Sequence, residues 1–194
     1  MQSVVLKEVK CYKYALSFLV HMYQTLIYNR EDDMQSYVYT LEADIEPIEG
    51  FYNGKPFFRK IFQPGYAEAA VARLVQSFPH PNVVSIYNIT EEYYDMEYLP
   101  IGDANIDDAS MTCAKDHLQS IGVMYIDWKC DNVRMTSDGV CKLIDFDCSG
   151  ILSSDGSWLS PPPMYYNYKR ARLAGMTTPK EIDEHAFSEF IRNL

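Results

Sequence analysis

The chain has 194 residues, of which 47% are hydrophobic and 23% are charged. This length lies at the upper edge of one ordinary domain and the apolar content is enough for a core, which excludes a disordered or collagen-like chain. The 27 acidic and 17 basic residues give a formal net charge of −10, which argues against nucleic acid or an anionic membrane as the main partner.

The cysteines and the apolar runs predict where the protein resides. There are five cysteines with no C-x-x-C pair among them, which favours a reducing, cytoplasmic compartment and argues against a zinc site. The most apolar stretch, residues 14–28, is too short to span a bilayer, and no small-residue cleavage site follows it. We therefore expect a soluble protein with no membrane partner.

The first segment has helical periodicity. Apolar residues recur every three or four positions from Val5 to Ile27, which predicts a long amphipathic helix that ends near Asn29, within an N-terminal region 1–34. The apolar face of this helix must pack either on its own domain or on a protein partner.

From residue 36 the pattern is mixed. Strands are predicted by β-branched and aromatic residues, a hairpin by Asn53-Gly54, and helices by a period of three to four. Thr178, Pro179 and Glu181 form a capping box that opens the last helix. The expected elements are strand 36–41, hairpin 50–62, helix 66–77, strands 83–89 and 93–98, helix 109–121, strands 133–135 and 140–144, an irregular stretch 157–163, and helix 181–193.

One segment in the second half carries the groups that phosphoryl transfer needs. Asp127, Lys129 and Asn132 lie on one predicted loop, and Asp145 follows the hairpin after it. A carboxylate can orient an attacking hydroxyl, a lysine can offset charge on the moving phosphoryl group, and an amide with a second carboxylate can bind magnesium.

These residues resemble the eukaryotic-type protein kinase family, serine/threonine branch. Asp127-x-Lys129-x-x-Asn132 matches the family's catalytic loop, and Asp145-Phe-Asp147 stands where the family has D-F-G. Three further matches come upstream in the family's order. They are Phe58-Arg-Lys60, His80-Pro-Asn-Val-Val84, and Met96-Glu97-Tyr98-Leu99 at the hinge.

The resemblance implies a fold and a set of roles. The fold would be α+β, with a small antiparallel-sheet N-lobe at 35–99, which includes helix C, and a shortened, mostly helical C-lobe at 100–194 that ends near helix F. ATP and Mg²⁺ would be the cofactors. The implied roles are Asp127 and Lys129 in catalysis, Asn132 and Asp145 as metal ligands, and Lys60, Glu68, Glu97 and Leu99 at the nucleotide.

The chain also departs from the family's pattern. No glycine-rich loop precedes Lys60, and Tyr125 and Ile126 replace the family's histidine and arginine, so that a phosphorylated activation loop would lack its basic anchor. The distance from Glu68 to His80 is two or three residues longer than the family norm, which leaves Glu68 either as the partner of Lys60 or as a surface residue. Asp183 is either a buried acceptor for the catalytic loop or an exposed first-turn acid.

Three functions remain open from the sequence. The first is a minimal kinase that phosphorylates serine or threonine on a protein. The chain also has a weaker resemblance to compact kinases of large DNA viruses. That resemblance would place the protein in a host cell. The second is an inactive, partner-binding pseudokinase, and the third is a small-molecule kinase of the aminoglycoside-phosphotransferase type. An acidic cluster around the hinge either binds basic residues of a substrate or is a solvated face. Its members are Glu91, Glu92, Asp95, Glu97, Asp103, Asp107 and Asp108.

Overall fold

The computed structural model describes residues 49–53, 55–62, 65–100 and 106–194. The chain divides into two units, 1–46 and 47–194, and all described residues belong to the second. The predicted helix within 1–34 and the strand at 36–41 lie outside the described residues. The described part is α+β, as predicted, with four α-helices and small antiparallel sheets.

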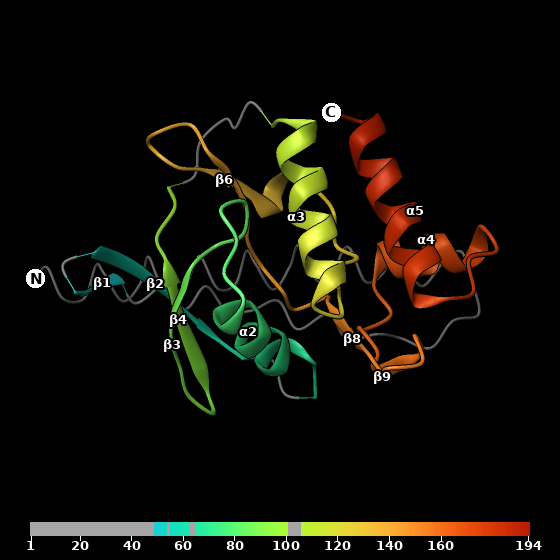
Figure 1. Ribbon diagram of the computed structural model, residues 1–194, viewed down its shortest axis with the longest axis horizontal. Helices are drawn as coiled ribbons and strands as arrows, with labels where there is room; N and C mark the ends of the chain where they lie inside the picture. The colour runs from blue at the N-terminus through green and yellow to red at the C-terminus, as the bar shows by residue number, and fades with distance from the viewer. Residues whose placement is uncertain (1–48, 54, 63–64, 101–105) are drawn as a thin grey trace, which may run out of the picture. The chain divides into compact units, whose positions relative to one another are not determined.

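A four-stranded sheet opens the described part (Figure 1). Its strands are β1 (Glu49–Tyr52), β2 (Lys55–Ile61), β3 (Ile86–Ile89) and β4 (Tyr93–Glu97), in the order β1-β2-β4-β3. All neighbours are antiparallel, and Asn53 has a φ of 50°, as the predicted tight turn between β1 and β2 requires. Helix α2 (Glu68–Ser77) packs on this sheet through Val71, Ala72 and Val75, which recur at helical spacing and are all buried.

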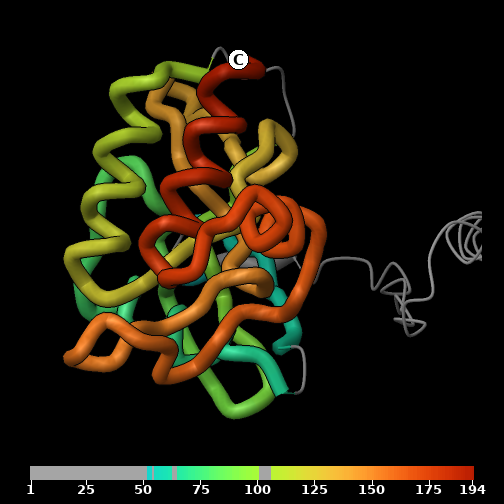
Figure 2. Tube along the Cα trace, turned by 90° about the vertical axis from the view of Figure 1, so that its right-hand side faces the viewer, coloured from blue at the N-terminus to red at the C-terminus, as the bar shows by residue number. Residues whose placement is uncertain are grey.

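The remaining elements are helices and short strands. They are α3 (Asp108–Ser120), β5 (Val123–Met124), the 3₁₀ turn η1 (Cys130–Asn132), β6 (Val133–Met135), β7 (Cys141–Leu143), β8 (Gly150–Leu152), β9 (Trp158–Ser160), α4 (Tyr166–Leu173) and α5 (Pro179–Arg192). Helices α3 and α5 run antiparallel, side by side (Figures 1 and 2), and are linked by Lys115 to Glu184 and Gln119 to Asp183. β6 pairs with β7 as the predicted hairpin, and β5, β8 and β9 form a three-stranded sheet.

A large hydrophobic core joins most of these elements, and a second, smaller cluster contains Ile126, Ala171 of α4 and Ile182 of α5. The large core includes Val71 of α2, Tyr94 of β4, Leu118 of α3 and Phe187 of α5, all buried. Trp128, on the loop before η1, packs its ring against Phe187 at a centroid distance of 4.8 Å. The loop that carries the candidate site therefore rests directly on the core.

Two predictions about local structure are wrong in part. The stretch 157–163 is not wholly irregular, because β9 occupies residues 158–160 and pairs with β8. The strand predicted at 83–89 begins only at Ile86, since the backbone of residues 82–84 hydrogen-bonds to Leu143 of β7 instead of to β4. Helix α4 and strands β5 and β8 were not predicted, because each is short and lacks a clear apolar period.

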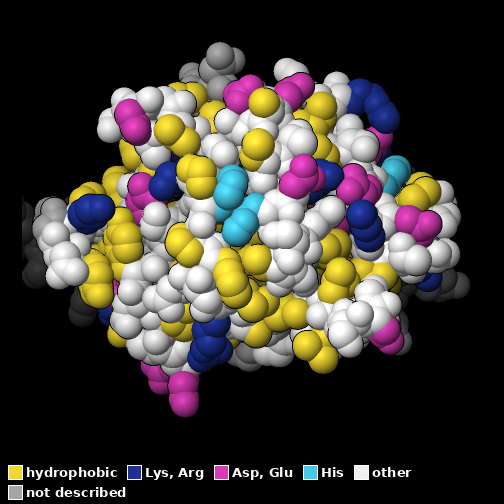
Figure 3. Space-filling model, in the orientation of Figure 1, with side chains coloured by type: hydrophobic (Ala, Val, Ile, Leu, Met, Phe, Trp, Pro, Cys, Tyr) yellow, Lys and Arg dark blue, Asp and Glu magenta, His cyan; other side chains and the backbone are white. Residues whose placement is uncertain are grey.

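The surface face in Figure 3 mixes acidic, basic and hydrophobic side chains. Within the described ranges, no helix combines the length and apolar character needed to cross a bilayer.

Trp158 and Pro162 pack closely against Gly150, and this packing predicts the effect of a substitution on stability. A Cβ at this position would lie 2.5 Å from Trp158 Cζ3 and 2.6 Å from Pro162 Cδ, inside van der Waals contact. We expect Gly150→Ala to lower the free energy of unfolding by about 1–3 kcal/mol, because the β8–β9 segment must shift.

Chemical denaturation of both variants measures this. The control is Gly156→Ala, whose glycine has open space around it but a φ of 82°, and which should cost only the backbone strain of about 1 kcal/mol. Equal stability of Gly150→Ala and wild type would show that the segment is not tightly packed.

Candidate active site

Lys60 of β2 lies between two carboxylates. Its Nζ is 2.8 Å from Glu68 Oε1 on α2 and 2.5 Å from Asp145 Oδ1 on the loop after β7. Glu68 is fully buried and also accepts a hydrogen bond from the Tyr94 hydroxyl at 3.1 Å. The interpretation of Glu68 as a solvated surface residue is therefore wrong, and the structure pairs it with Lys60.

These contacts set the charge states of the group. Burial opposes the charge on the Lys60 ammonium, but its pKa is raised well above the ordinary value by the groups that surround it, which are Tyr94, Asp145 and Glu68. Burial also opposes the charge on Asp145, yet the charge and hydrogen bond of Lys60 outweigh it and lower the Asp145 pKa. At neutral pH the site therefore holds an ammonium and a carboxylate in direct contact.

The loop of residues 127–132 presents the other predicted residues together. Lys129 Nζ is 2.6 Å from Asp127 Oδ2, and Lys129 is exposed. The buried Asn132 donates from Nδ2 to Asp127 Oδ2 at 2.9 Å and to the Asp127 carbonyl at 3.0 Å. Because the nitrogen is used in this way, the amide oxygen of Asn132 is the atom available to a cation.

The backbone of this loop is strained and is held by α5. Ile126 has a φ of 67°, a conformation that is costly for a β-branched residue. Asp183 of α5 is 1% exposed and accepts from the Ile126 N–H at 2.9 Å and from the Trp128 indole at 2.8 Å. The alternative that Asp183 is an exposed first-turn acid is therefore wrong.

A second cluster lies beside the loop and was not assigned from the sequence. The ligand atoms of Asp127, Asp147 and Cys148 all lie within 4.8 Å of one another. Burial and the charge of Asp145 raise the pKa of Asp147 to about 6, and burial together with Asp147 raises that of the Cys148 thiol. The aspartate in place of the third D-F-G residue was the one sequence signal for this cluster.

The donor chemistry of the site fits Mg²⁺. Asp127 and Asp147 bring carboxylate oxygens within 4.8 Å of each other, the Asn132 amide lies beside Asp127, and Asp145 accepts from the Asp147 N–H. Carboxylate and amide oxygens are the hard ligands that magnesium prefers. Cys148 is a poor ligand here because its thiol keeps its proton. The oxygen donors of this region could therefore hold a hard divalent cation, with Asp147 as a donor that the sequence did not assign.

The acidic cluster is a solvated face in part. Glu91, Glu92, Asp107 and Asp108 are exposed, Asp95 and Glu97 are in ion pairs, and Asp103 lies outside the described residues. Glu97 Oε2 is 2.5 Å from Lys142 Nζ on β7, and Asp95, 4% exposed, pairs with Arg59 at 2.7 Å and 3.0 Å. Leu99 is partly buried against the core. Two members of the cluster are therefore structural ion pairs, and Asp107 is the N-cap of α3.

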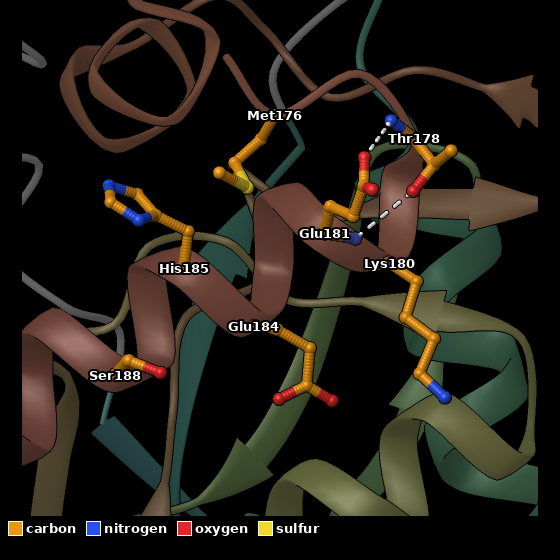
Figure 4. Close-up of a pocket in the computed structure, with 7 residues that line it drawn as sticks. All are labelled: Met176, Thr178, Lys180, Glu181, Glu184, His185 and Ser188. Atoms are coloured by element: carbon orange, nitrogen blue, oxygen red, sulfur yellow. Dashed lines mark hydrogen bonds between the residues drawn. The ribbon is translucent and has the colours of Figure 1, made fainter. Parts of the chain in front are cut away.

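A surface pocket of about 420 Å³ lies elsewhere, on the outward side of α5 (Figure 4). Met176, His185 and Ser188 are among the residues that line it, and the capping box of Thr178 and Glu181 forms one end, as predicted. None of the predicted catalytic or cofactor residues lines this pocket.

No protein-family model matches the chain. The residues and their geometry therefore carry the functional argument.

The raised pKa of Asp147 predicts a pH dependence of stability. Its folded pKa of about 6 exceeds the ordinary 3.8, so the folded state keeps a proton that the unfolded state has already lost. This group's contribution is full below about pH 4 and is lost as the pH rises through 6. We expect Asp147→Asn to abolish this loss, on the order of 2–3 kcal/mol, and to be more stable than wild type at pH 7.

Denaturation of both proteins from pH 4 to pH 8 checks this expectation. Asp131→Asn, a substitution at an exposed residue of the same loop, should follow the wild-type curve. Parallel curves for wild type and Asp147→Asn would show that Asp147 titrates normally.

Proposed function

We propose that the protein is a compact kinase-like phosphotransferase that moves a phosphoryl group from ATP to serine or threonine of a protein, with Mg²⁺. The observation that carries this proposal is the position of Lys60, which contacts Glu68 on α2 and also Asp145, 85 residues later in the sequence. In protein kinases a strand lysine must pair with a helix glutamate while the D-F-G aspartate holds magnesium. A surface ion pair would not need two partners from separate elements.

The arrangement of the elements supports the same proposal. The sheet with α2 would be the N-lobe with helix C, and α5, with Asp183 beneath the loop, would be helix F. Glu97 and Leu99 would lie at the nucleotide base, because Glu97 ends β4 and Leu99 follows two residues later.

Each residue of the site then has a chemical task. Asp127 would accept a hydrogen bond from the attacking hydroxyl and take its proton as the bond to phosphorus forms. Lys129, 2.6 Å from Asp127, would offset negative charge on the phosphoryl group. Asn132 and Asp145 would hold magnesium, which when bound offsets charge on the phosphates.

A small-molecule acceptor is the second candidate, and Asp147 favours it. An acid after D-F is common in kinases of the aminoglycoside-phosphotransferase type, and here the ion pairs of Asp95 and Glu97 remove two acids from any surface for a basic peptide. The exposed acids Glu91, Glu92 and Asp108 remain for a peptide.

Asp127→Asn tests the function directly. We expect the transfer rate to fall by about 10²- to 10⁴-fold with ATP affinity nearly unchanged, because the removed carboxylate acts mainly in the transition state. Asn132→Ala should lower turnover and also raise the magnesium concentration needed.

The measurement is transfer of radioactive phosphate beside nucleotide affinity from thermal shift, over a magnesium titration. Asp131→Asn, at an exposed position in the same loop, is the matched control and should behave as wild type. Wild-type transfer by Asp127→Asn would refute the assigned base. If wild type neither transfers phosphate nor binds ATP, a partner-binding pseudokinase is the better description.

The acceptor class is decided by a competition. We expect a basic protein such as histone to be labelled faster than an acidic protein at low salt, because the exposed acids attract positive charge. The difference should shrink as salt rises above about 0.15 M, where the Debye length is about 8 Å. Labelling of an aminoglycoside or choline with none on protein would instead establish the small-molecule kinase.

A further inference from the structure

The segment between β9 and α4 touches both the loop that carries Asp127 and the start of the helix that carries Glu68. Asn167, in the first turn of α4, donates from Nδ2 to the Ile126 carbonyl at 3.3 Å, the Trp128 carbonyl at 3.5 Å and Asp127 Oδ1 at 3.5 Å. Two residues earlier, the Tyr165 hydroxyl lies 3.0 Å from the hydroxyl of Tyr66, which precedes α2.

We propose that residues 165–167 form a permanent brace, with Asn167 as a positioning residue for Asp127 and Tyr165 as a positioning residue for α2. The proposal rests on the proposed phosphoryl transfer. It adds that the site is held in its working geometry without phosphorylation of the chain.

The oxygen atoms around the Asn167 side chain are hydrogen-bond acceptors, so this position requires a hydrogen-bond donor. Its amide nitrogen faces three oxygen atoms, two of them carbonyls of the strained loop and the third the carboxylate of Asp127. Asp183 satisfies the N–H groups of this loop from the α5 side, and Asn167 supplies a donor to its carbonyls from the α4 side. An acceptor at position 167 would repel all three oxygens.

Tyr165 contacts the segment that leads into α2, on the side of the site that carries Glu68. The rings of Tyr66 and Tyr165 meet edge to face at 6.3 Å, and their hydroxyls hydrogen-bond. Tyr66 lies two residues before Glu68, so the contact fixes the first turn of α2, from which Glu68 reaches Lys60. One short segment therefore positions both the base and the lysine–glutamate pair.

The brace is itself fixed by local structure. Pro161, Pro162 and Pro163 precede it and have restricted φ, which reduces the conformational entropy lost on ordering. Pro162 is buried against Gly150, and the Tyr165 N–H donates to the Pro163 carbonyl at 2.8 Å. Since Ile126 stands where the resembled family has an arginine, the brace would fix this loop without that arginine.

The kinetic test uses three substitutions at one position. Asn167→His keeps a donor nitrogen at the same number of bonds from Cα, Asn167→Ala removes it, and Asn167→Asp replaces it with an acceptor. We expect kcat to fall by about 10- to 100-fold in the alanine variant and further in the aspartate variant, with the ATP KM within about twofold and partial rescue in the histidine variant.

Tyr165→Phe should have the complementary effect. Loss of the hydroxyl contact frees the start of α2, so the ATP KM should rise by about two- to tenfold, the value of one ordinary hydrogen bond, with a smaller change in kcat. Phosphatase treatment of the wild-type protein should leave kcat unchanged. Loss of transfer after that treatment would overturn the brace as a replacement for phosphorylation.

Hydrogen exchange tests the brace independently of activity. Amides in a peptide covering residues 125–132 should exchange faster in Asn167→Ala and Asn167→Asp than in wild type. The control is Asn193→Ala at the end of α5, which should not change them. Wild-type exchange and wild-type kcat in Asn167→Asp would refute the brace. Absence of transfer in wild type, with faster exchange in the variants, would refute the phosphotransferase and leave the brace standing as a structural element.

Discussion

The Lys60 ammonium is the charge on which the described fold and its site both depend. Glu68 is fully buried, and a buried carboxylate is stable only when a cation and hydrogen bonds compensate it. One oxygen of Glu68 has Lys60 and Tyr94 as partners, while Oε2 is buried with no hydrogen-bond partner among the described residues. Without Lys60, α2 would hold an uncompensated charge against the sheet, so the pairing fixes β2, α2 and the loop after β7 relative to one another.

Backbone strain is concentrated beside the same charges. Ile126 and Asp145 both have positive φ, and each adjoins or belongs to the candidate site. Such conformations cost on the order of 1–3 kcal/mol each and persist only where the surroundings hold them. Asp183 and Asn167 supply that restraint for Ile126 from two helices, and the contact with Lys60 supplies it for Asp145. The helices after the hairpin therefore act as supports for one loop.

The sequence predicts best those features that depend only on residues nearby in the chain. The hairpin at Asn53 and the capping box at Thr178 depend on neighbours a few residues away, and both are confirmed. Lys60 is only eight residues from Glu68, but their contact depends on how α2 packs on the sheet. Asp183 is buried through contacts with Ile126 and Trp128, which come 57 and 55 residues earlier. The sequence therefore leaves two interpretations for each acid. Strands β8 and β9 are not indicated by the sequence, whereas β6 and β7, which are equally short, are predicted by the turn between them.

The candidate site carries more negative than positive charge. Two lysine ammonium groups, on Lys60 and Lys129, face the four carboxylates of Glu68, Asp127, Asp145 and Asp147. Asp147 makes no ion pair within the described ranges, and burial together with the charge of Asp145 raises its pKa. A polyanionic nucleotide would meet repulsion there unless a divalent cation offset both sets of charges. For the proposed nucleotide, the acidic site therefore favours binding only together with a divalent cation.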